Sequence, residues 1–169
     1  MTNYTLPYFG QINLAELKDY YKVKINLNQS TVSIDLNFNN NSIDQSTIET
    51  IENFLGNIEN FDIKNRSHIK NDLQESGETF EYLNFLLEEF YEDEMSQIID
   101  LDNAESSKEI LLFNKLKLYR IGLYPSNKNE SDYYSVFDYS IDIDGEACNQ
   151  VLAVKTNKEG TLNHIAWES

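Results

Sequence analysis

Residues 21–38 read YKVKINLNQSTVSIDLNF and contain two runs in which apolar and polar residues alternate. Apolar side chains occupy every second position from Tyr21 to Leu27, and again from Val32 to Phe38. Successive side chains point to opposite faces of a β-strand, so each run predicts a strand with one apolar face. The short polar segment between them, residues 28–30, is typical of a tight turn. We therefore predict an antiparallel β-hairpin that buries one of its faces.

Apolar residues at helical spacing follow the hairpin. Ser42, with Gln45 three residues later, is expected to cap a first helix. A thinner pattern predicts a second helix over residues 59–75. The strongest pattern predicts a third over residues 79–95, with one apolar stripe and an acidic opposite face. Ser106 is expected to cap a short further helix, so the segment should contain three to four helices.

The remainder of the chain reads as strands at hairpin spacing, over residues 116–124, 133–143, 150–155 and 162–167. Such spacing favours a C-terminal antiparallel meander. Strands, then helices, then strands is the order of an α+β fold, with helices packed on one face of a sheet. With no internal repeat and no linker-like stretch, residues 1–169 are predicted to form a single domain.

The charge of the chain is unusual. It contains 29 Asp and Glu against 13 Lys and Arg, a net charge of -16 on 169 residues. A magnitude of about 2–8 suits a small soluble domain, and the excess adds self-repulsion to the folded state. A cationic protein partner is the simplest use for such a field. Lys and Arg form no cluster that would contact phosphates, so neither nucleic acid nor an anionic membrane is expected as a ligand.

The single cysteine, Cys148, has no second cysteine to pair with inside the chain, which favours a reducing compartment. The first ten residues lack the basic and apolar regions of a signal peptide. No apolar run approaches the roughly 20 residues of a membrane-spanning helix. We therefore expect a cytoplasmic protein, and the sequence leaves its oligomeric state open.

Acidic residues near the end of the predicted third helix are the main candidates for partner binding. They are Glu88, Glu89, Glu92, Asp93 and Glu94. A merely solvated helix face is the simpler interpretation. However, like charges four residues apart destabilise a helix by about 0.2–0.5 kcal/mol each, and few lysines are placed to offset them. This cost favours the hypothesis that the face docks a cationic protein.

Two further candidates come from the aromatic strand over residues 133–143. Alternation places Tyr134 and Asp138 on the face opposite Phe137 and Tyr139, which are expected in the core. Because tyrosine is common at binding interfaces, Tyr134 and Asp138 are predicted as additional partner contacts.

Three aspartates before Gly145 suggest a calcium loop: Asp138, Asp142 and Asp144. Aligned with the loop motif, the first and twelfth positions fall on Ser140 and Val151, where carboxylates are required. An ordinary Asp-Gly turn therefore explains the pattern better, and cation binding there stays open. We predict no metal and no cofactor.

No catalytic residues are predicted. His68 and His164 each lack a neighbouring histidine or cysteine, so neither suggests a zinc site. The chain contains no G-x-S-x-G elbow, although the members of a Ser-His-Asp triad need not be close in sequence. Acidic residues next to Cys148 oppose a reactive thiolate.

Four motifs resemble one protein family. They are YTLPYFG (residues 4–10), INL (residues 12–14), IDLNF (residues 34–38) and HIAWE (residues 164–168). Together they resemble the bacterial family known as domain of unknown function 2004, over nearly the whole chain. Small acidic proteins of this kind often resemble immunity proteins, which neutralise toxins delivered by competing bacteria.

The function expected from these observations is that of a non-enzymatic acidic binding protein, an immunity-like inhibitor of a cationic bacterial toxin. Two alternatives stay open. One is a small enzyme that uses carboxylates, with or without a metal, on a polar substrate. The other is a structural or regulatory interaction module.

Overall fold

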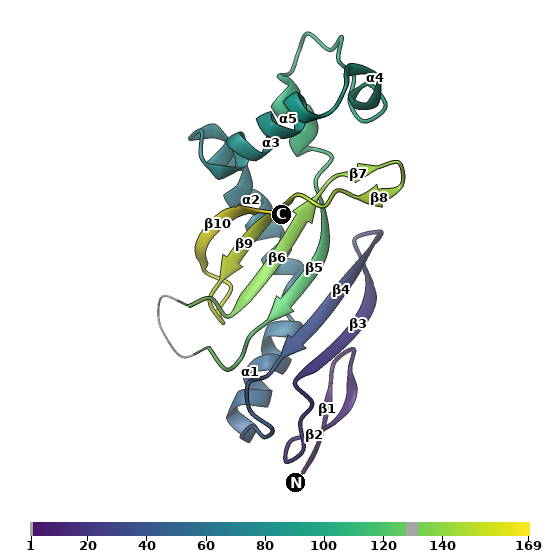
Figure 1. Ribbon diagram of the computed structural model, residues 1–169. Helices are drawn as coiled ribbons and strands as arrows, with labels where there is room; N and C mark the ends of the chain where they lie inside the picture. Colours follow the sequence, from purple (N-terminus) through teal and green to yellow (C-terminus); the bar gives the residue numbers. More distant parts are fainter. Residues whose placement is uncertain (1, 128–131) are drawn as a thin grey trace.

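The computed structural model describes residues 2–127 and 132–169. Its elements, in chain order, are β1 (Asn3–Leu6), β2 (Gly10–Asn13), β3 (Tyr20–Leu27), β4 (Ser30–Asn37), α1 (Gln45–Leu55), α2 (Ile58–Gln74), α3 (Glu78–Glu89), α4 (Glu92–Met95), α5 (Lys108–Phe113), β5 (Lys117–Leu123), β6 (Ser135–Ser140), β7 (Asp142–Ile143), β8 (Glu146–Ala147), β9 (Val151–Thr156) and β10 (Leu162–Glu168). The α+β prediction is confirmed: strands, then helices, then strands succeed one another along the chain (Figure 1). Within the described ranges there are five helices rather than the expected three to four.

The predicted hairpin is confirmed as β3 and β4. The strands are antiparallel, with Tyr21 opposite Leu36 and Ile25 opposite Val32. Only two residues form the turn, because Ser30 already pairs with Leu27. Asn28 and Gln29 have φ of 49° and 66°, the left-handed conformations that a type I′ turn requires.

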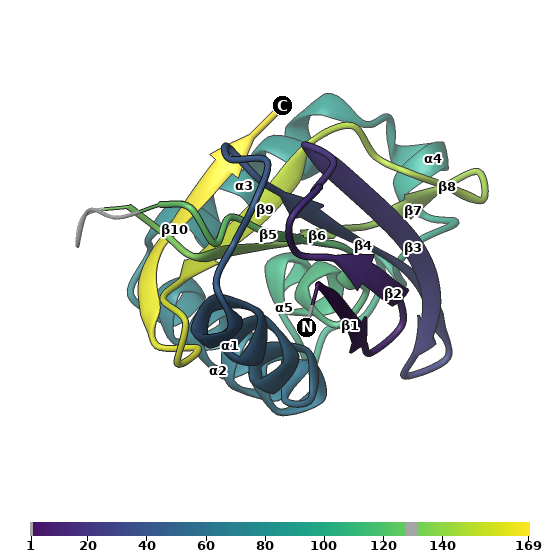
Figure 2. The ribbon, with the colours of Figure 1, turned by 90° about the horizontal axis from the view of Figure 1, so that it is seen from below.

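The predicted meander is also confirmed, and it continues into the hairpin. The main sheet has six strands in the order β10-β9-β6-β5-β4-β3. All neighbours are antiparallel except β4 and β5, which pair in parallel, with Ile34 opposite Ile121. Helices α1 and α2 lie behind this sheet in Figure 1 and below it in Figure 2. We call the opposite face of the sheet the outer face.

The core lies between the sheet and the helices. Leu36 from β4, Ile121 from β5 and Phe137 from β6 are fully buried there. The Phe54 ring of α1 packs against Phe137, with ring centroids 6.2 Å apart. Burial of this kind contributes about 1.5–3 kcal/mol for each large apolar side chain.

The prediction that Tyr134 shares a face with Asp138 is wrong. The Tyr134 ring lies 5.3 Å from the Phe54 ring on the helix side of the sheet, and its hydroxyl is buried. Regular alternation does not reach Tyr134, because β6 begins only at Ser135. Asp138, inside β6, does lie on the outer face.

The predicted third helix over residues 79–95 is wrong at its C-terminal end. Helix α3 stops at Glu89, Phe90 is extended with φ of -89° and ψ of 138°, and α4 starts at Glu92. A continuous helix would place Glu88 and Glu92 one turn apart, where they repel. In the first turn of a new helix, the acids instead meet the positive end of the helix dipole.

Two predicted helix caps are displaced along the chain. Asp44, not Ser42, caps α1, and its carboxylate accepts a hydrogen bond of 2.7 Å from the Thr47 backbone N–H. Ser107, not Ser106, caps α5 by accepting from the Ile110 N–H. In the part of the chain that the structure describes, none of the helices has the length and apolar character needed to span a bilayer.

Candidate functional site

Half of the net charge of the protein is concentrated in the acidic segment, residues 88–109. This segment contains nine Asp and Glu and one Lys, a net charge of -8 out of -16. It runs from the end of α3 through α4 to the first turn of α5. In Figure 1 it lies at the top of the molecule, at the opposite end from the N-terminus.

Two buried apolar side chains fix the acidic segment to the body of the protein. Met95 at the end of α4 is 2% exposed, and Ile99 just after it is 4% exposed. Between these anchors and α5, Asp100 and Asn103 hold the backbone by accepting hydrogen bonds from N–H groups two or three residues later. The segment therefore has defined structure, and most of its charged side chains are exposed.

The structure brings the five predicted acidic residues into this segment, but on two helices. Glu88 and Glu89 are exposed at the end of α3, and Glu92 and Asp93 are exposed at the start of α4. Glu94 is half-buried and accepts a hydrogen bond of 3.0 Å from the Tyr91 N–H, so it also caps α4. Among the described residues, none of the nine carboxylates of the segment forms an ion pair.

An exposed aromatic residue lies among these acids. Tyr91 is 78% exposed, at the break between α3 and α4. It lines a shallow hollow of about 690 Å³, together with Leu101 and the acidic residues Glu92, Asp93 and Asp102. Apolar periodicity places Tyr91 in a helix stripe, so its exposure was not expected from the sequence. The signal that could have revealed it was Glu92-Asp93-Glu94, an acidic run typical of the start of a helix.

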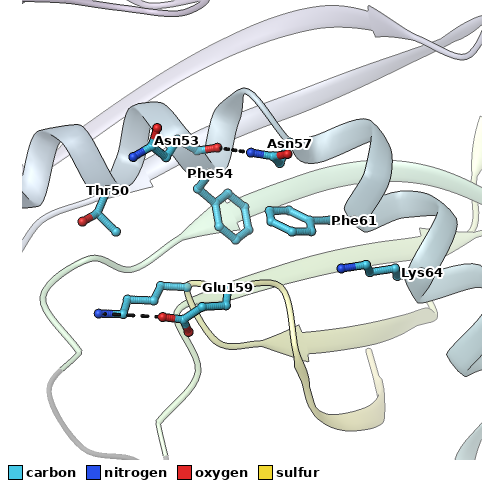
Figure 3. A pocket seen from close by; sticks show the side chains of 8 residues that line it. Thr50, Asn53, Phe54, Asn57, Phe61, Lys64 and Glu159 are labelled. Atoms are coloured by element: carbon cyan, nitrogen blue, oxygen red, sulfur yellow. Dashed lines mark hydrogen bonds and ion pairs between the residues drawn. The ribbon is translucent and has the colours of Figure 1, made fainter.

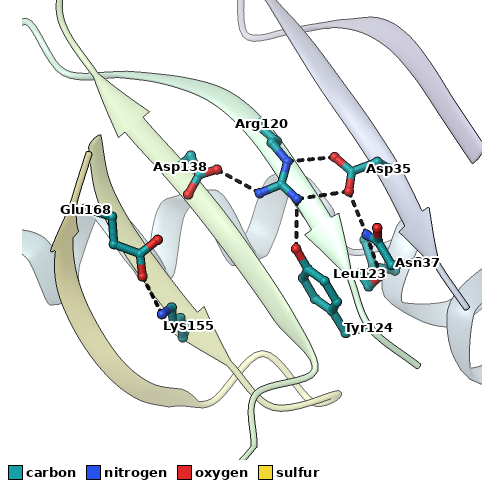
Figure 4. A network of polar contacts seen from close by, with 8 residues as sticks. All are labelled: Asp35, Asn37, Arg120, Leu123, Tyr124, Asp138, Lys155 and Glu168. Carbon is teal, nitrogen blue, oxygen red and sulfur yellow. Dashed lines mark hydrogen bonds and ion pairs between the residues drawn. The ribbon is translucent and has the colours of Figure 1, made fainter. Parts of the chain in front are cut away.

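A second polar group occupies the outer face of the sheet, centred on Arg120 (Figure 4). The Nε and Nη2 atoms of Arg120 donate to the Asp35 carboxylate over 2.7 and 3.0 Å. Its Nη1 donates to Asp138 over 2.9 Å, and its Nη2 also donates to the Tyr124 hydroxyl over 2.9 Å. An irregularity in β5 at Tyr119 turns Arg120 to this face, opposite Asp138. The group thus joins β4, β5 and β6.

Gly122 leaves room for the guanidinium. A Cβ atom at this position would lie 2.5 Å from Nη2 of Arg120. The Asp35 side chain beneath is only 1% exposed. A side chain at position 122 would therefore displace the arginine from a carboxylate that is shielded from water.

The electrostatics of this group suit a structural role. Burial alone would lower the pKa of Arg120, but hydrogen bonds to Asp35, Asp138 and Tyr124 outweigh it and hold the pKa well above its ordinary value. Burial raises the pKa of Asp138, and Arg120 opposes that rise. Four of the five N–H donors of Arg120 are engaged, which leaves little for a ligand. The carboxylate predicted as a partner contact at Asp138 is therefore occupied within the protein.

The three aspartates of the suspected calcium loop have separate surroundings. Asp138 bonds to Arg120, whereas Asp142 accepts from the Lys117 ammonium and the Tyr119 hydroxyl, which lower its pKa. Asp144 is exposed in the β7–β8 turn, with φ of 52°. Across residues 2–127 and 132–169, no three or more His, Cys, Asp or Glu side chains are grouped so as to hold a metal ion. The prediction that the protein binds no metal is tested by calorimetric titration with calcium and zinc after chelator treatment.

The remaining reactive side chains lie on separate elements. His68 is on α2, His164 is exposed on β10, and Cys148 is half-buried after β8. No catalytic role follows from these positions. No family model matches the chain, and neither the curated proteins nor the solved structures contain a significant match.

Proposed function

We propose that the protein is a non-enzymatic binding protein whose acidic segment holds a cationic protein partner. The resemblance to the domain of unknown function 2004 family extends this to an immunity-like role against a cationic toxin. The observation that carries the proposal is the net charge of -8 on residues 88–109, three of whose carboxylates line a hollow with the exposed Tyr91.

The Tyr91 hollow supports binding rather than simple solvation. Binding energy at protein interfaces is concentrated in a few residues, often tyrosine, surrounded by a rim that excludes water. Tyr91 and Leu101 provide apolar contact area, and Glu92, Asp93 and Asp102 surround it with charge. The matching surface would carry an apolar or aromatic side chain within a ring of lysines and arginines.

Electrostatic attraction would act chiefly on the rate of association. Complementary fields raise association rates from about 10⁵–10⁶ to about 10⁸–10⁹ M⁻¹s⁻¹. Salt screens this attraction, because the Debye length falls from about 8 Å at physiological ionic strength to roughly 3 Å at 1 M. Association should therefore slow steeply with added salt, while dissociation changes less.

Surface-plasmon kinetics against the product of the adjacent gene, at several salt concentrations, test the proposal. One variant carries Glu88→Gln, Glu89→Gln, Glu92→Gln and Asp93→Asn, and it keeps Glu94 because Glu94 caps α4. A control variant neutralises four exposed acids outside the segment, namely Asp19, Glu59, Glu75 and Glu81. Both variants have a net charge of -12, four units less negative than the -16 of the wild type, so only position distinguishes them.

The segment variant should associate at least tenfold more slowly at low salt, and the control variant should stay close to wild type. Tyr91→Ala should instead speed dissociation, with a loss of about 2 kcal/mol in binding free energy if Tyr91 is a hot spot. Equal effects of the two charge variants, or association that ignores salt, would show that the acidic segment is only solvated surface. No binding at all would reject the adjacent-gene partner.

A further inference from the structure

A pocket of about 520 Å³ lies between the ends of α1 and α2 and the β9–β10 turn (Figure 3). Its volume falls within the roughly 300–1,000 Å³ typical of small-molecule sites. It shares no residue with the acidic segment, so a ligand here is independent of the proposed function.

The charge of this pocket is opposite in sign to that of the protein. Lys64 from α2 and Lys158 from the turn both line it, and Glu159 is the one carboxylate among its lining residues. The lining thus has a formal charge of +1 in a chain of -16. The Lys158 Nζ and Glu159 Oε1 atoms lie 3.9 Å apart, and both side chains are 60% exposed. Ion pairs that are this exposed to water are weak. Lys158 is therefore available to an incoming anion.

The walls of the pocket are fixed without a ligand. The Asn157 side-chain oxygen accepts from the Glu159 and Thr161 N–H groups over 3.0 and 2.8 Å, which closes the turn. Gly160 has φ of 74°, and a Cβ there would lie 2.3 Å from the Phe61 ring. Only glycine allows the turn to approach α2 so closely, and this contact holds the turn, with Lys158 and Glu159, against the pocket.

The neutral lining is polar. The Asn57 amide nitrogen donates to the Asn53 carbonyl oxygen over 2.8 Å, which leaves the Asn57 amide oxygen available. The Asn53 side chain and the Thr50 hydroxyl oxygen also line the pocket. Phe54 and Phe61 form its floor, but they are only 1% and 7% exposed, so they offer a ligand little apolar area. Hydroxyl groups suit such a lining better than a hydrocarbon body.

We propose that this pocket binds a small phosphate ester of a polyol, of the sugar-phosphate type. The exposed Lys64 and Lys158 side chains would turn toward the phosphate, and the hydroxyls would bond to Asn53 and Asn57. A phosphate monoester carries a charge of about -1.5 to -2 at neutral pH, which matches two ammonium groups better than a single carboxylate does. Lysine binds phosphate as a point charge and needs no fixed fork geometry.

Amide chemical shifts report binding residue by residue, so a titration followed by ¹⁵N–¹H NMR at low salt is the test. Ribose 5-phosphate is the probe, with ribose and inorganic phosphate as separate arms. Ribose 5-phosphate should shift amides in residues 50–64 and 157–161, and inorganic phosphate should bind at least several-fold more weakly. Ribose alone should produce no shift.

Matched variants locate the site. Lys64→Ala and Lys158→Ala should each weaken binding at least tenfold, whereas Lys70→Ala, an equal charge change at an exposed position of the same helix, should not. Glu159→Gln should tighten binding. The spectra themselves show that each variant is folded.

Three results would overturn the inference. They are no shift at millimolar ribose 5-phosphate, equal weakening by Lys70→Ala, or shifts confined to other parts of the protein. Equal affinity for inorganic phosphate would refute the polyol part of it.

Discussion

Three strands contribute to the ion network at Arg120. The network matters for stability because the Asp35 carboxylate is buried. The Asp35 carboxylate is almost inaccessible to water, while Arg120 is about one-third exposed. A buried ion pair adds little to stability compared with an apolar replacement, but removing one partner leaves an uncompensated charge. The network therefore makes the sheet sensitive to the loss of a single side chain.

Arg120→Met should lower the free energy of unfolding by about 3 kcal/mol at pH 7, the lower end of the range for a broken buried pair, because Arg120 is partly solvated. Urea denaturation measures the loss. Lys24→Met is the control, since Lys24 lies on the outer face without an ion pair among the described residues and should change stability by less than about 0.5 kcal/mol. Similar losses in the two variants would contradict a special role for Arg120.

Asp142 should make a pH-dependent contribution. Hydrogen bonds from Lys117 and then Tyr119 lower its pKa in the folded protein. Its stabilisation is therefore fully present above the unfolded-state pKa of about 3.9 and is lost as the pH falls through the lower folded-state pKa. Asp142→Asn should be less stable than wild type by up to about 1 kcal/mol at pH 7, and the difference should close below about pH 4. A difference that stays constant from pH 7 to pH 3 would rule this out.

Single residues show where sequence reasoning succeeded and failed. Alternation placed Asp138 opposite Phe137, as found, but it did not reveal Arg120 as its partner. Arg120 reaches the outer face only because the irregularity at Tyr119 shifts the register of β5. The pairing of β4 with β5, which brings Asp35 to the same group, joins strands that are remote in sequence. Local alternation of apolar and polar residues predicts neither the irregularity at Tyr119 nor the pairing of β4 with β5.

At the scale of elements, the hairpin and the meander were predictable because their patterns are local. The limits of helices were less so. Apolar periodicity runs across Phe90 and Tyr91, whereas the acids at positions 92–94 start a new helix there. Because the helix-start pattern prevailed over the periodicity, Tyr91 lies at the break between α3 and α4. There it is exposed and lines the hollow of the candidate site. Competition between periodicity and helix-terminus electrostatics was therefore decisive.

Adjacent serines provide a test of the cap of α5. Ser107 accepts from the Ile110 N–H over 3.3 Å, while the Ser106 N–H is bound by Asn103. Ser107→Ala should cost about 0.5–2 kcal/mol of stability, as cap removal does elsewhere. Ser106→Ala should stay within about 0.5 kcal/mol. Thermal unfolding of the two variants is the comparison, and a larger loss for Ser106→Ala would return the cap to the position expected from sequence.

At the scale of the whole molecule, the charge of -16 opposes folding, and half of it is placed on one-eighth of the chain. Repulsion within the acidic segment is strongest when salt is scarce. The dense charge near Tyr91 lowers the stability of the folded state, and a domain without a binding partner would gain nothing from it.

Added sodium chloride should therefore stabilise the protein. Raising it from low ionic strength to about 0.5 M should increase stability by roughly 1 kcal/mol, which corresponds to about 2–4 °C in Tm for a chain of this size. The variant neutralised at Glu88, Glu89, Glu92 and Asp93 should respond less than the control variant of equal net charge. Scanning calorimetry provides the measurement, and a Tm that is flat or falls with salt would show that self-repulsion is unimportant.

The parallel pairing of β4 with β5 has a consequence for how the chain reaches this structure. Residues 38–116, with all five helices of the described ranges, separate these two interior strands in the sequence. During synthesis on the ribosome, β4 emerges early and can pair with β3. Its other edge stays unpaired until β5 has been made. Pairings between remote strands form slowly, and unpaired strand edges invite aggregation in the meantime. The β1–β2 hairpin and the helices are made before β5, so they are the segments available to shield the apolar face of the β3–β4 hairpin until the C-terminal meander arrives.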